Sequence, residues 1–244
     1  NNKVVVITGA GSGMGRETAI LFGQKGYTVV GTDINEATLN GTISEIKKEG
    51  GKAYGVTADI TKVDDIKNLA KEVEKKVKKI DVLINCAGLL GGIHNLVDFN
   101  EKDMDLILDV NLKGTYRCCK YLLPLIVKNK NSIIINISSQ SGKIGQAGVS
   151  IYGAAKWGVI GFTKALELEA KKDGIKVVVI NPGSTNSPFH NRREKKLDKD
   201  LLDRFLKPIE IARACLFVAE QSDNCIIKEM DVVPMSETIE CVIK

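Results

Sequence analysis

The sequence predicts an α/β protein: a doubly wound parallel sheet with helices on both faces, three layers formed by residues 1–244 as a single domain. Short runs rich in β-branched residues alternate with longer helical patterns along the chain. Several of the short runs are almost wholly apolar, as expected of parallel strands that are covered on both faces. At 244 residues the chain is also long enough to bury a substantial core.

The elements follow in strict alternation, which favours right-handed crossover connections. The expected strands are Val4–Thr8, Thr28–Thr32, Ala53–Thr57, Val82–Asn85, Ser132–Ile137, Lys176–Ile180 and a short final strand, Met230–Val233. The expected helices are Arg16–Lys25, Glu36–Glu49, Val63–Lys78, Glu101–Lys128 with a break near Asn111, and Ile151–Lys171. In the last helix, an apolar stripe at helical spacing is formed by Ala155, Val159, Phe162, Ala165, Leu166 and Leu168.

The composition argues against several classes of protein. The net charge is +5, but lysines alternate with acids in stretches such as 44–52 and 70–79, which is typical of solvated helix faces rather than of nucleic-acid surfaces. No apolar run has the length of a membrane span. The six cysteines form no C-x-x-C pair, and neither of the two histidines stands at ligand spacing from them. We therefore expect a cytoplasmic protein with reduced thiols, no metal site, and neither a nucleic-acid nor a membrane partner.

A glycine-rich turn, TGAGSGMG at 8–15, joins the first strand directly to a helix. Glycines allow the backbone to approach a pyrophosphate, whose charge is stabilised at the helix N-terminus. This placement within a strand–helix–strand unit predicts a Rossmann-like dinucleotide site. The second strand leads to Asp33, whose carboxylate can bind the adenosine ribose and would repel a 2′-phosphate. Because its neighbours Ser12 and Ile34 are not basic, NAD is favoured over NADP as the cofactor.

Further motifs in the same order resemble the short-chain dehydrogenase/reductase family, in its compact single-domain branch, from about Val4 to Ala219. They are the TGxxxGxG turn, Asp59–Ile60, NCAG at 85–88 with Cys86 in place of the second Asn, DVNLKG at 109–114, NISSQSG at 136–142, YGAAK at 152–156 and NPG at 181–183. Together, the glycine turn and the resemblance assign the dinucleotide to Gly9, Ser12, Gly13, Met14, Gly15, Asp33, Ile34, Asp59, Ile60, Asn85, Ala87, Gly88, Tyr152, Lys156, Pro182, Gly183, Thr185 and Ser187.

The catalytic prediction rests on Tyr152 and Lys156, which lie four positions apart and so on one face of a helix. A cation about 4 Å from a phenolate stabilises it by about 4 kcal/mol at an effective dielectric near 20, about three pKa units. We therefore expect Lys156 to lower the pKa of Tyr152, so that the phenol exchanges a proton with an alcohol or ketone oxygen. The resemblance implies that Ser139, preferred over Ser138 by its spacing from Tyr152, binds that oxygen. It also implies that Asn111 holds a water linking the lysine to solvent.

These residues predict an NAD(H)-dependent oxidoreductase that interconverts a small secondary alcohol and a ketone, with a hydroxysteroid or a polyol among the candidate substrates. Two alternatives stay open: an NADPH-dependent 3-oxoacyl thioester reductase, and a non-catalytic dinucleotide-sensing protein. The expected pocket walls are 89–95, 140–146 and 184–193, with Leu89, Leu90, Ile93, Ile144 and Phe189 apolar and His94, Gln146 and His190 polar.

Two segments bear on access and assembly. The long irregular stretch 182–201 is expected to form a lid over the substrate, because a loop of this length in a compact domain is more often functional than idle. The segment 224–244 contains no glycine, unlike many family members. The resemblance implies a homotetramer or a homodimer.

Overall fold

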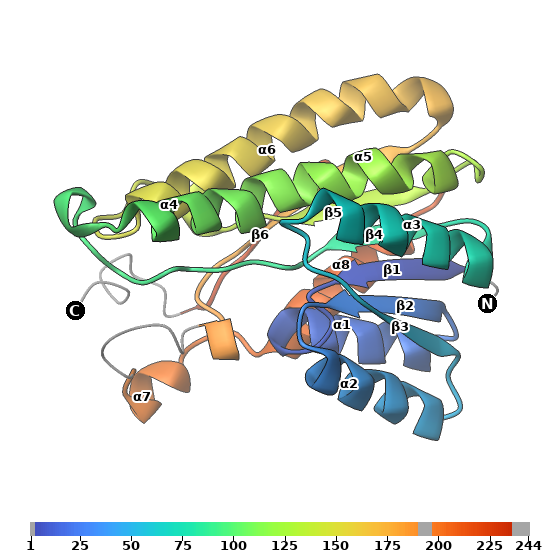
Figure 1. Cartoon of the computed structure of the whole chain (residues 1–244), viewed down its shortest axis with the longest axis horizontal. Helices are drawn as coiled ribbons and strands as arrows, with labels where there is room; N and C mark the ends of the chain where they lie inside the picture. Colours follow the sequence, from blue (N-terminus) through green and yellow to red (C-terminus); the bar gives the residue numbers. More distant parts are fainter. Residues whose placement is uncertain (1–2, 190–196, 236–244) are drawn as a thin grey trace.

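The computed structural model describes residues 3–189 and 197–235, and its described strands form one parallel sheet in the order β3-β2-β1-β4-β5-β6-β7 (Figure 1). The strands are β1 Val4–Thr8, β2 Thr28–Asp33, β3 Ala53–Thr57, β4 Val82–Asn85, β5 Ile133–Ile137, β6 Lys176–Pro182 and β7 Glu229–Val232. The α-helices are α1 Gly13–Gln24, α2 Glu36–Lys48, α3 Val63–Val77, α4 Glu101–Leu108, α5 Thr115–Ile126, α6 Ser150–Ala170, α7 Lys199–Leu202 and α8 Pro208–Ala219. Shorter helical turns are η1 Leu96–Asp98, η2 Asp109–Gly114, η3 Gln140–Gly142 and η4 Lys171–Asp173. The predicted fold class is confirmed.

The core lies on both faces of the sheet because successive side chains of a strand point to opposite sides. In β1, Val5 and Ile7 pack with buried residues of α1, α2 and α8, whereas Val4 and Val6 pack with those of α3, α5 and α6. All five residues of β1 are buried, which explains why this run shows no alternation of apolar and polar residues. The sheet therefore forms the middle of three layers (Figure 1).

The strand order reverses between β1 and β4. From β1 the chain moves outward through β2 to β3, then returns to place β4 on the other side of β1 and continues to β7. In open parallel sheets, ligands bind in the crevice outside the carboxyl ends of the strands at such a reversal. The glycine turn that follows β1 and the NCAG segment that ends β4 meet there, since Thr8 pairs with Asn85 across the two strands.

The break predicted near Asn111 is a π-helical turn, η2, which joins α4 to α5 without interrupting the helical path. The Asn111 side chain is fully buried, and its Nδ2 donates to the Ile107 carbonyl at 2.9 Å. A side chain that donates to a main-chain carbonyl of its own helix competes with the backbone N–H groups for that carbonyl, and the helix widens locally. The asparagine therefore correctly indicated an irregularity in this helix, but the irregularity is a π-bulge rather than a break.

The apolar stripe predicted on α6 is wrong in part. Ala155, Val159 and Leu166 are buried as expected, but Ala165 is exposed and the Leu168 side chain is 70% exposed. The reason is geometric: Leu168 lies three helical turns from the exposed Trp157 and so on the same outer face. Across the part of the chain that the structure describes, no helix is both long and apolar enough to cross a bilayer.

Candidate active site

The turn between β1 and α1 is shaped to approach an anionic group. Gly13 has φ +51°, a conformation that favours glycine, and a Cβ on Gly15 would lie 2.1 Å from the Gly9 carbonyl oxygen. Ser12 is the N-cap of α1, yet its side chain makes no capping hydrogen bond. Ser12 therefore leaves the first N–H groups of α1, at the positive end of the helix dipole, open to another acceptor. This arrangement fits the pyrophosphate of a dinucleotide.

Asp33 ends β2 beside this turn. Its Oδ2 accepts from the Gly11 N–H and its Oδ1 from the Asn35 N–H, each at 2.9 Å. Within the described ranges, no lysine or arginine forms an ion pair with this carboxylate, and the nearby Arg16 is paired with Glu17 and Glu45. The end of β2 thus presents a negative charge without a cationic partner.

A cleft runs from Asp33 across the carboxyl ends of β1 and β4. The predicted cofactor residues that line it are Gly9, Ser12, Gly13, Met14, Gly15, Asp33, Ile34, Asp59, Ile60, Ala87, Gly88 and Ser187. Asn85 was predicted among them, but the structure buries it under the cleft, where its Nδ2 donates to Asn136 Oδ1 at 2.8 Å. Its side chain therefore braces β4 against β5, and a contact of Asn85 with the dinucleotide stays a prediction.

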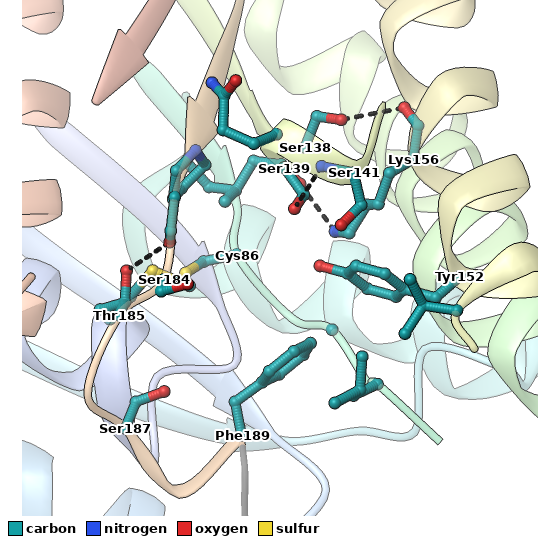
Figure 2. Close-up of a pocket in the computed structure, with 18 of the residues that line it drawn as sticks. Cys86, Ser138, Ser139, Ser141, Tyr152, Lys156, Ser184, Thr185, Ser187 and Phe189 are labelled. Carbon is teal, nitrogen blue, oxygen red and sulfur yellow. Dashed lines mark hydrogen bonds between the residues drawn. The ribbon is translucent and has the colours of Figure 1, made fainter. Parts of the chain in front are cut away.

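A second pocket adjoins the cleft and contains three of the four predicted catalytic side chains, those of Ser139, Tyr152 and Lys156 (Figure 2). Ser139 follows β5, and its Oγ accepts from the Ser141 N–H at 3.1 Å. Tyr152 and Lys156 project from α6 and are 6% and 4% exposed. Figure 2 shows the Tyr152 hydroxyl turned toward Ser139 and the Lys156 amine. Pro182, Gly183 and Thr185 line the same pocket.

The structure does not show the expected lowering of the Tyr152 pKa by Lys156. Burial raises the pKa of Tyr152 to about 12, and the neighbouring Ser139 hydroxyl acts in the opposite direction. The Lys156 Nζ lies 5.6 Å from the Tyr152 ring centroid and donates to the Ile137 carbonyl at 3.0 Å. Burial lowers the pKa of Lys156 to about 8. Desolvation therefore decides the direction of both shifts, and the phenol stays protonated at neutral pH.

Asn111 lies behind this pocket rather than in it. Its Oδ1 accepts from the Leu89 N–H at 3.1 Å, and its Nδ2 donates to the Leu89 carbonyl at 2.7 Å. The side chain thus fixes the segment that follows β4, including Gly88, which lines both the pocket and the cleft. A role in holding a water stays a prediction.

Comparison with known families adds the deciding observation. The family model described as short chain dehydrogenase matches residues 3–198. The chain belongs to the short-chain dehydrogenase family. It is an oxidoreductase of this family, and a nicotinamide dinucleotide is the family's cofactor.

Relatives of this short-chain dehydrogenase have several names. A 3-oxoacyl-[acyl-carrier-protein] reductase of Thermotoga maritima is 37% identical over 227 residues, covering 91% of this chain and 92% of the relative. A cyclohexanol dehydrogenase of an Acinetobacter species is 32% identical, covering 96% and 94%. The crystal structure of a 3-ketoacyl-(acyl-carrier-protein) reductase from Brucella melitensis, complexed with NADH, is 31% identical, with a TM-score of 0.86 and coverage of 95% and 96%.

Some of the expected pocket walls lie elsewhere in this dehydrogenase. Leu90, Gln146 and Phe189 line the catalytic pocket, and Leu89 lines the dinucleotide cleft. Ile93, His94 and Ile144 do not line the catalytic pocket. The His94 ring instead packs edge-on against Phe99, with centroids 5.3 Å apart, and the Ile144 side chain is 40% exposed.

The expected lid, 182–201, is described only in part, because 190–196, with His190, lies outside the described residues. Its first part turns back over the cleft: the Phe189 ring centroid lies 5.7 Å from that of Tyr152. Its base is tied down, since the Asn186 N–H donates to the Leu206 carbonyl and the Leu206 N–H donates to the Ser184 carbonyl.

The structure gives Ser138 a contact that the sequence did not predict. Its Oγ, 3% exposed, donates to the Lys156 main-chain carbonyl at 2.9 Å and so joins the end of β5 to the catalytic helix (Figure 2). Cys86 was noted only as a departure from the family motif, yet it lines both pocket and cleft. For Ser138, the only signal in the sequence is its position next to Ser139.

Proposed function

We propose that this short-chain dehydrogenase reduces the ketone of a 3-oxoacyl thioester to a secondary alcohol, with NADH as the hydride donor. The observation that carries the proposal is that the dinucleotide cleft and the catalytic pocket are continuous. Met14, Cys86, Gly88, Ser187 and Phe189 line both the dinucleotide cleft and the pocket that holds Tyr152. A ketone bound in that pocket would therefore lie beside a nicotinamide bound in the cleft.

The cleft residues would hold a reduced nicotinamide dinucleotide, which would supply the hydride that the carbonyl carbon gains. On the protein's side, Ser139 donates a hydrogen bond to the carbonyl oxygen as negative charge develops there. Tyr152 transfers its phenolic proton to the same oxygen, which completes the hydroxyl group. Lys156, close to the Tyr152 ring, stabilises the phenolate that remains until a proton is regained from solvent. Asn111 positions the backbone at Leu89 beside them.

Two observations support a ketone substrate in the direction of reduction. The pKa of Tyr152, raised to about 12 by burial, keeps the phenol in the form that can donate a proton. Two of the three relatives named above are called 3-oxoacyl or 3-ketoacyl reductases. Oxidation of a simple secondary alcohol is the second candidate, favoured by the relative named cyclohexanol dehydrogenase.

The test of the chemistry is Tyr152→Phe, assayed by loss of NADH absorbance with acetoacetyl-coenzyme A. We expect turnover to fall at least about 100-fold while calorimetric titration still detects NADH binding, because only the proton donor is lost. Tyr116→Phe, a half-exposed tyrosine of α5, is the matched control and should keep wild-type turnover. Wild-type rates in Tyr152→Phe would refute the proton-donor role, and NADH binding without turnover of any alcohol or ketone would favour the dinucleotide-sensing alternative.

The preference for NADH over NADPH rests on Asp33, whose carboxylate has no cationic partner among the described residues and would repel a 2′-phosphate. We expect the wild type to show a higher kcat/KM with NADH, and Asp33→Asn to lower the ratio of NADH to NADPH efficiency about tenfold. Asp64→Asn, at a fully exposed position on α3, is the control for a lost surface charge. A wild-type preference for NADPH of tenfold or more would contradict this assignment of the cofactor.

The lid, the site of action and the assembly belong to the same proposal. Residues 182–201 would cover the substrate, and the protein would act in the cytoplasm. Trp157 and Leu168 on α6 and Tyr116 on α5 expose apolar surface that a second copy could cover, in keeping with a homodimer or homotetramer. Light scattering of the purified protein tests the assembly, and a monomer at micromolar concentration would contradict it.

A further inference from the structure

The catalytic pocket contains a glutamine whose amide is held in place at one end only. Gln146 lies in the segment between η3 and α6, is half-buried, and lines the pocket together with Tyr152. Its Oε1 accepts a hydrogen bond from the Ser141 hydroxyl at 2.9 Å. Within the described part of the chain, its NH2 group donates no hydrogen bond. A glutamine amide has two N–H donors at that end, so the site offers donors that the protein does not use.

The orientation of this amide is coupled to the reacting group. Ser141, 8% exposed, donates its hydroxyl to Gln146 and its backbone N–H to the Ser139 Oγ, the latter at 3.1 Å. The segment that carries Gln146 is also held from outside, since the Gly148 carbonyl accepts from the His94 N–H at 2.9 Å. A single residue, Ser141, thus links the glutamine amide to the serine that faces the carbonyl oxygen.

The neighbouring wall of the pocket is apolar. Leu90, Val149 and Phe189 line it, and they offer a substrate contact area without polar side-chain atoms. Another pocket-lining glutamine, Gln140, has already used its Nε2 to bind the Asn181 carbonyl at 3.1 Å. A substrate that pairs with the Gln146 donors therefore needs a hydrogen-bond acceptor of its own, placed near the reacting ketone on an otherwise apolar chain.

We propose that Gln146 determines substrate specificity by donating a hydrogen bond to a second carbonyl oxygen, the thioester or ester carbonyl two carbons from the ketone. This inference rests on the proposed function and names the residue that would recognise the second carbonyl of such a 1,3-dicarbonyl substrate. With the ketone oxygen at Ser139 and Tyr152, the second oxygen satisfies the Gln146 amide. A ketone without a second carbonyl, such as a simple cyclic ketone, leaves the Gln146 amide hydrogen-bonded to water. Such a ketone therefore lacks the binding free energy of this hydrogen bond.

The experiment compares two substrates that differ in one group: ethyl acetoacetate, and its analogue in which a CH2 replaces the ester carbonyl. The measured quantity is the ratio of their kcat/KM values with NADH. Gln146→Leu removes the whole amide. Gln146→Glu keeps an oxygen that accepts from Ser141 but has no N–H donor. We expect each variant to lower the ratio about tenfold, the value of one neutral hydrogen bond of about 1.4 kcal/mol.

Gln140→Leu is the matched control, because it removes a pocket-lining amide whose donor is already paired, and the ratio should stay as in the wild type. A ratio unchanged in both Gln146 variants would overturn the inference. So would a loss confined to Gln146→Leu, which would mean that the residue acts through Ser141, and so would an equal loss in Gln140→Leu. Failure of the wild type to reduce either ketone would refute the proposed function, and this inference with it.

Discussion

Lys156 should destabilise the folded protein at neutral pH, and its replacement by methionine should make the protein more stable while abolishing turnover. The side chain is 4% exposed, and in the part of the chain that the structure describes no carboxylate pairs with it. Its pKa is lowered by burial from 10.5 to about 8. A difference of about 2.5 pKa units between the unfolded and folded chains corresponds to about 3 kcal/mol of lost stability when the amine is charged in both.

Methionine has a similar length and no charge, so Lys156→Met removes this cost. It also removes the hydrogen bond from Nζ to the Ile137 carbonyl, which contributes about 1 kcal/mol. The net gain in the free energy of unfolding is therefore about 2 kcal/mol at pH 7. For a chain of this length, that corresponds to a rise of about 4–8 °C in Tm.

The stability difference between Lys156→Met and the wild type should depend on pH. Below pH 8 the folded and unfolded chains both bind the lysine proton, and the full cost of burying the charge is present. As the pH rises from about 8 to 10.5, the folded protein releases the proton first, so the cost falls. The stability advantage of Lys156→Met should therefore be largest at pH 7 and should nearly vanish at pH 10.

Urea unfolding of the wild type and of Lys156→Met at both pH values measures this difference. Lys171→Met, an exposed lysine at the C-terminal end of the same helix, is the control and should change stability by less than about 0.5 kcal/mol. A Lys156→Met protein that is less stable than the wild type at pH 7, or that keeps its full advantage at pH 10, would refute the claim that the buried amine is charged at a cost.

Three further predictions concern a buried hydrogen bond and two glycines. Thr163→Val should lower the free energy of unfolding by about 1–3 kcal/mol in urea titrations, because the buried Asn136 Nδ2 donates to the Thr163 Oγ1 at 3.0 Å and would lose its acceptor; an unchanged midpoint would contradict this. Gly41→Ala, in an open position of α2, should raise the free energy of unfolding by about 0.5–1 kcal/mol. Gly15→Ala should abolish NADH binding in calorimetry, because its Cβ would lie 2.1 Å from the Gly9 carbonyl oxygen, and retained binding would argue against a tight glycine turn.

Much of the site could be predicted from sequence because its signals are local. The glycine turn follows a buried strand directly, and a strand end followed by a helix start defines where the phosphates of a dinucleotide bind. Tyr152 and Lys156 share a helix face through their spacing, and the structure brings both into the pocket that contains Ser139. In each case the period of the helix or strand decides which way a side chain points.

The sequence was less informative about how individual side chains are placed. Asn85 belongs to a recognisable motif, but its side chain is held by Asn136 of the next strand. Leu168 lies nine residues, or about two and a half helical turns, after Val159, so it faces away from that buried side chain and is exposed. Cys86 could not be placed in the pocket without knowing how β1 and β4 lie against each other.

By itself, the sequence determined the order of strands and helices, the glycine turn and the spacing of Tyr152 and Lys156, because hydrophobic period and residue spacing are properties of a short stretch of chain. Only the tertiary structure decided the protonation of those two groups. The pKa of Tyr152 is raised and that of Lys156 lowered by burial beneath segments far away in the chain. Desolvation depends on everything packed around a group, and no local pattern contains that information.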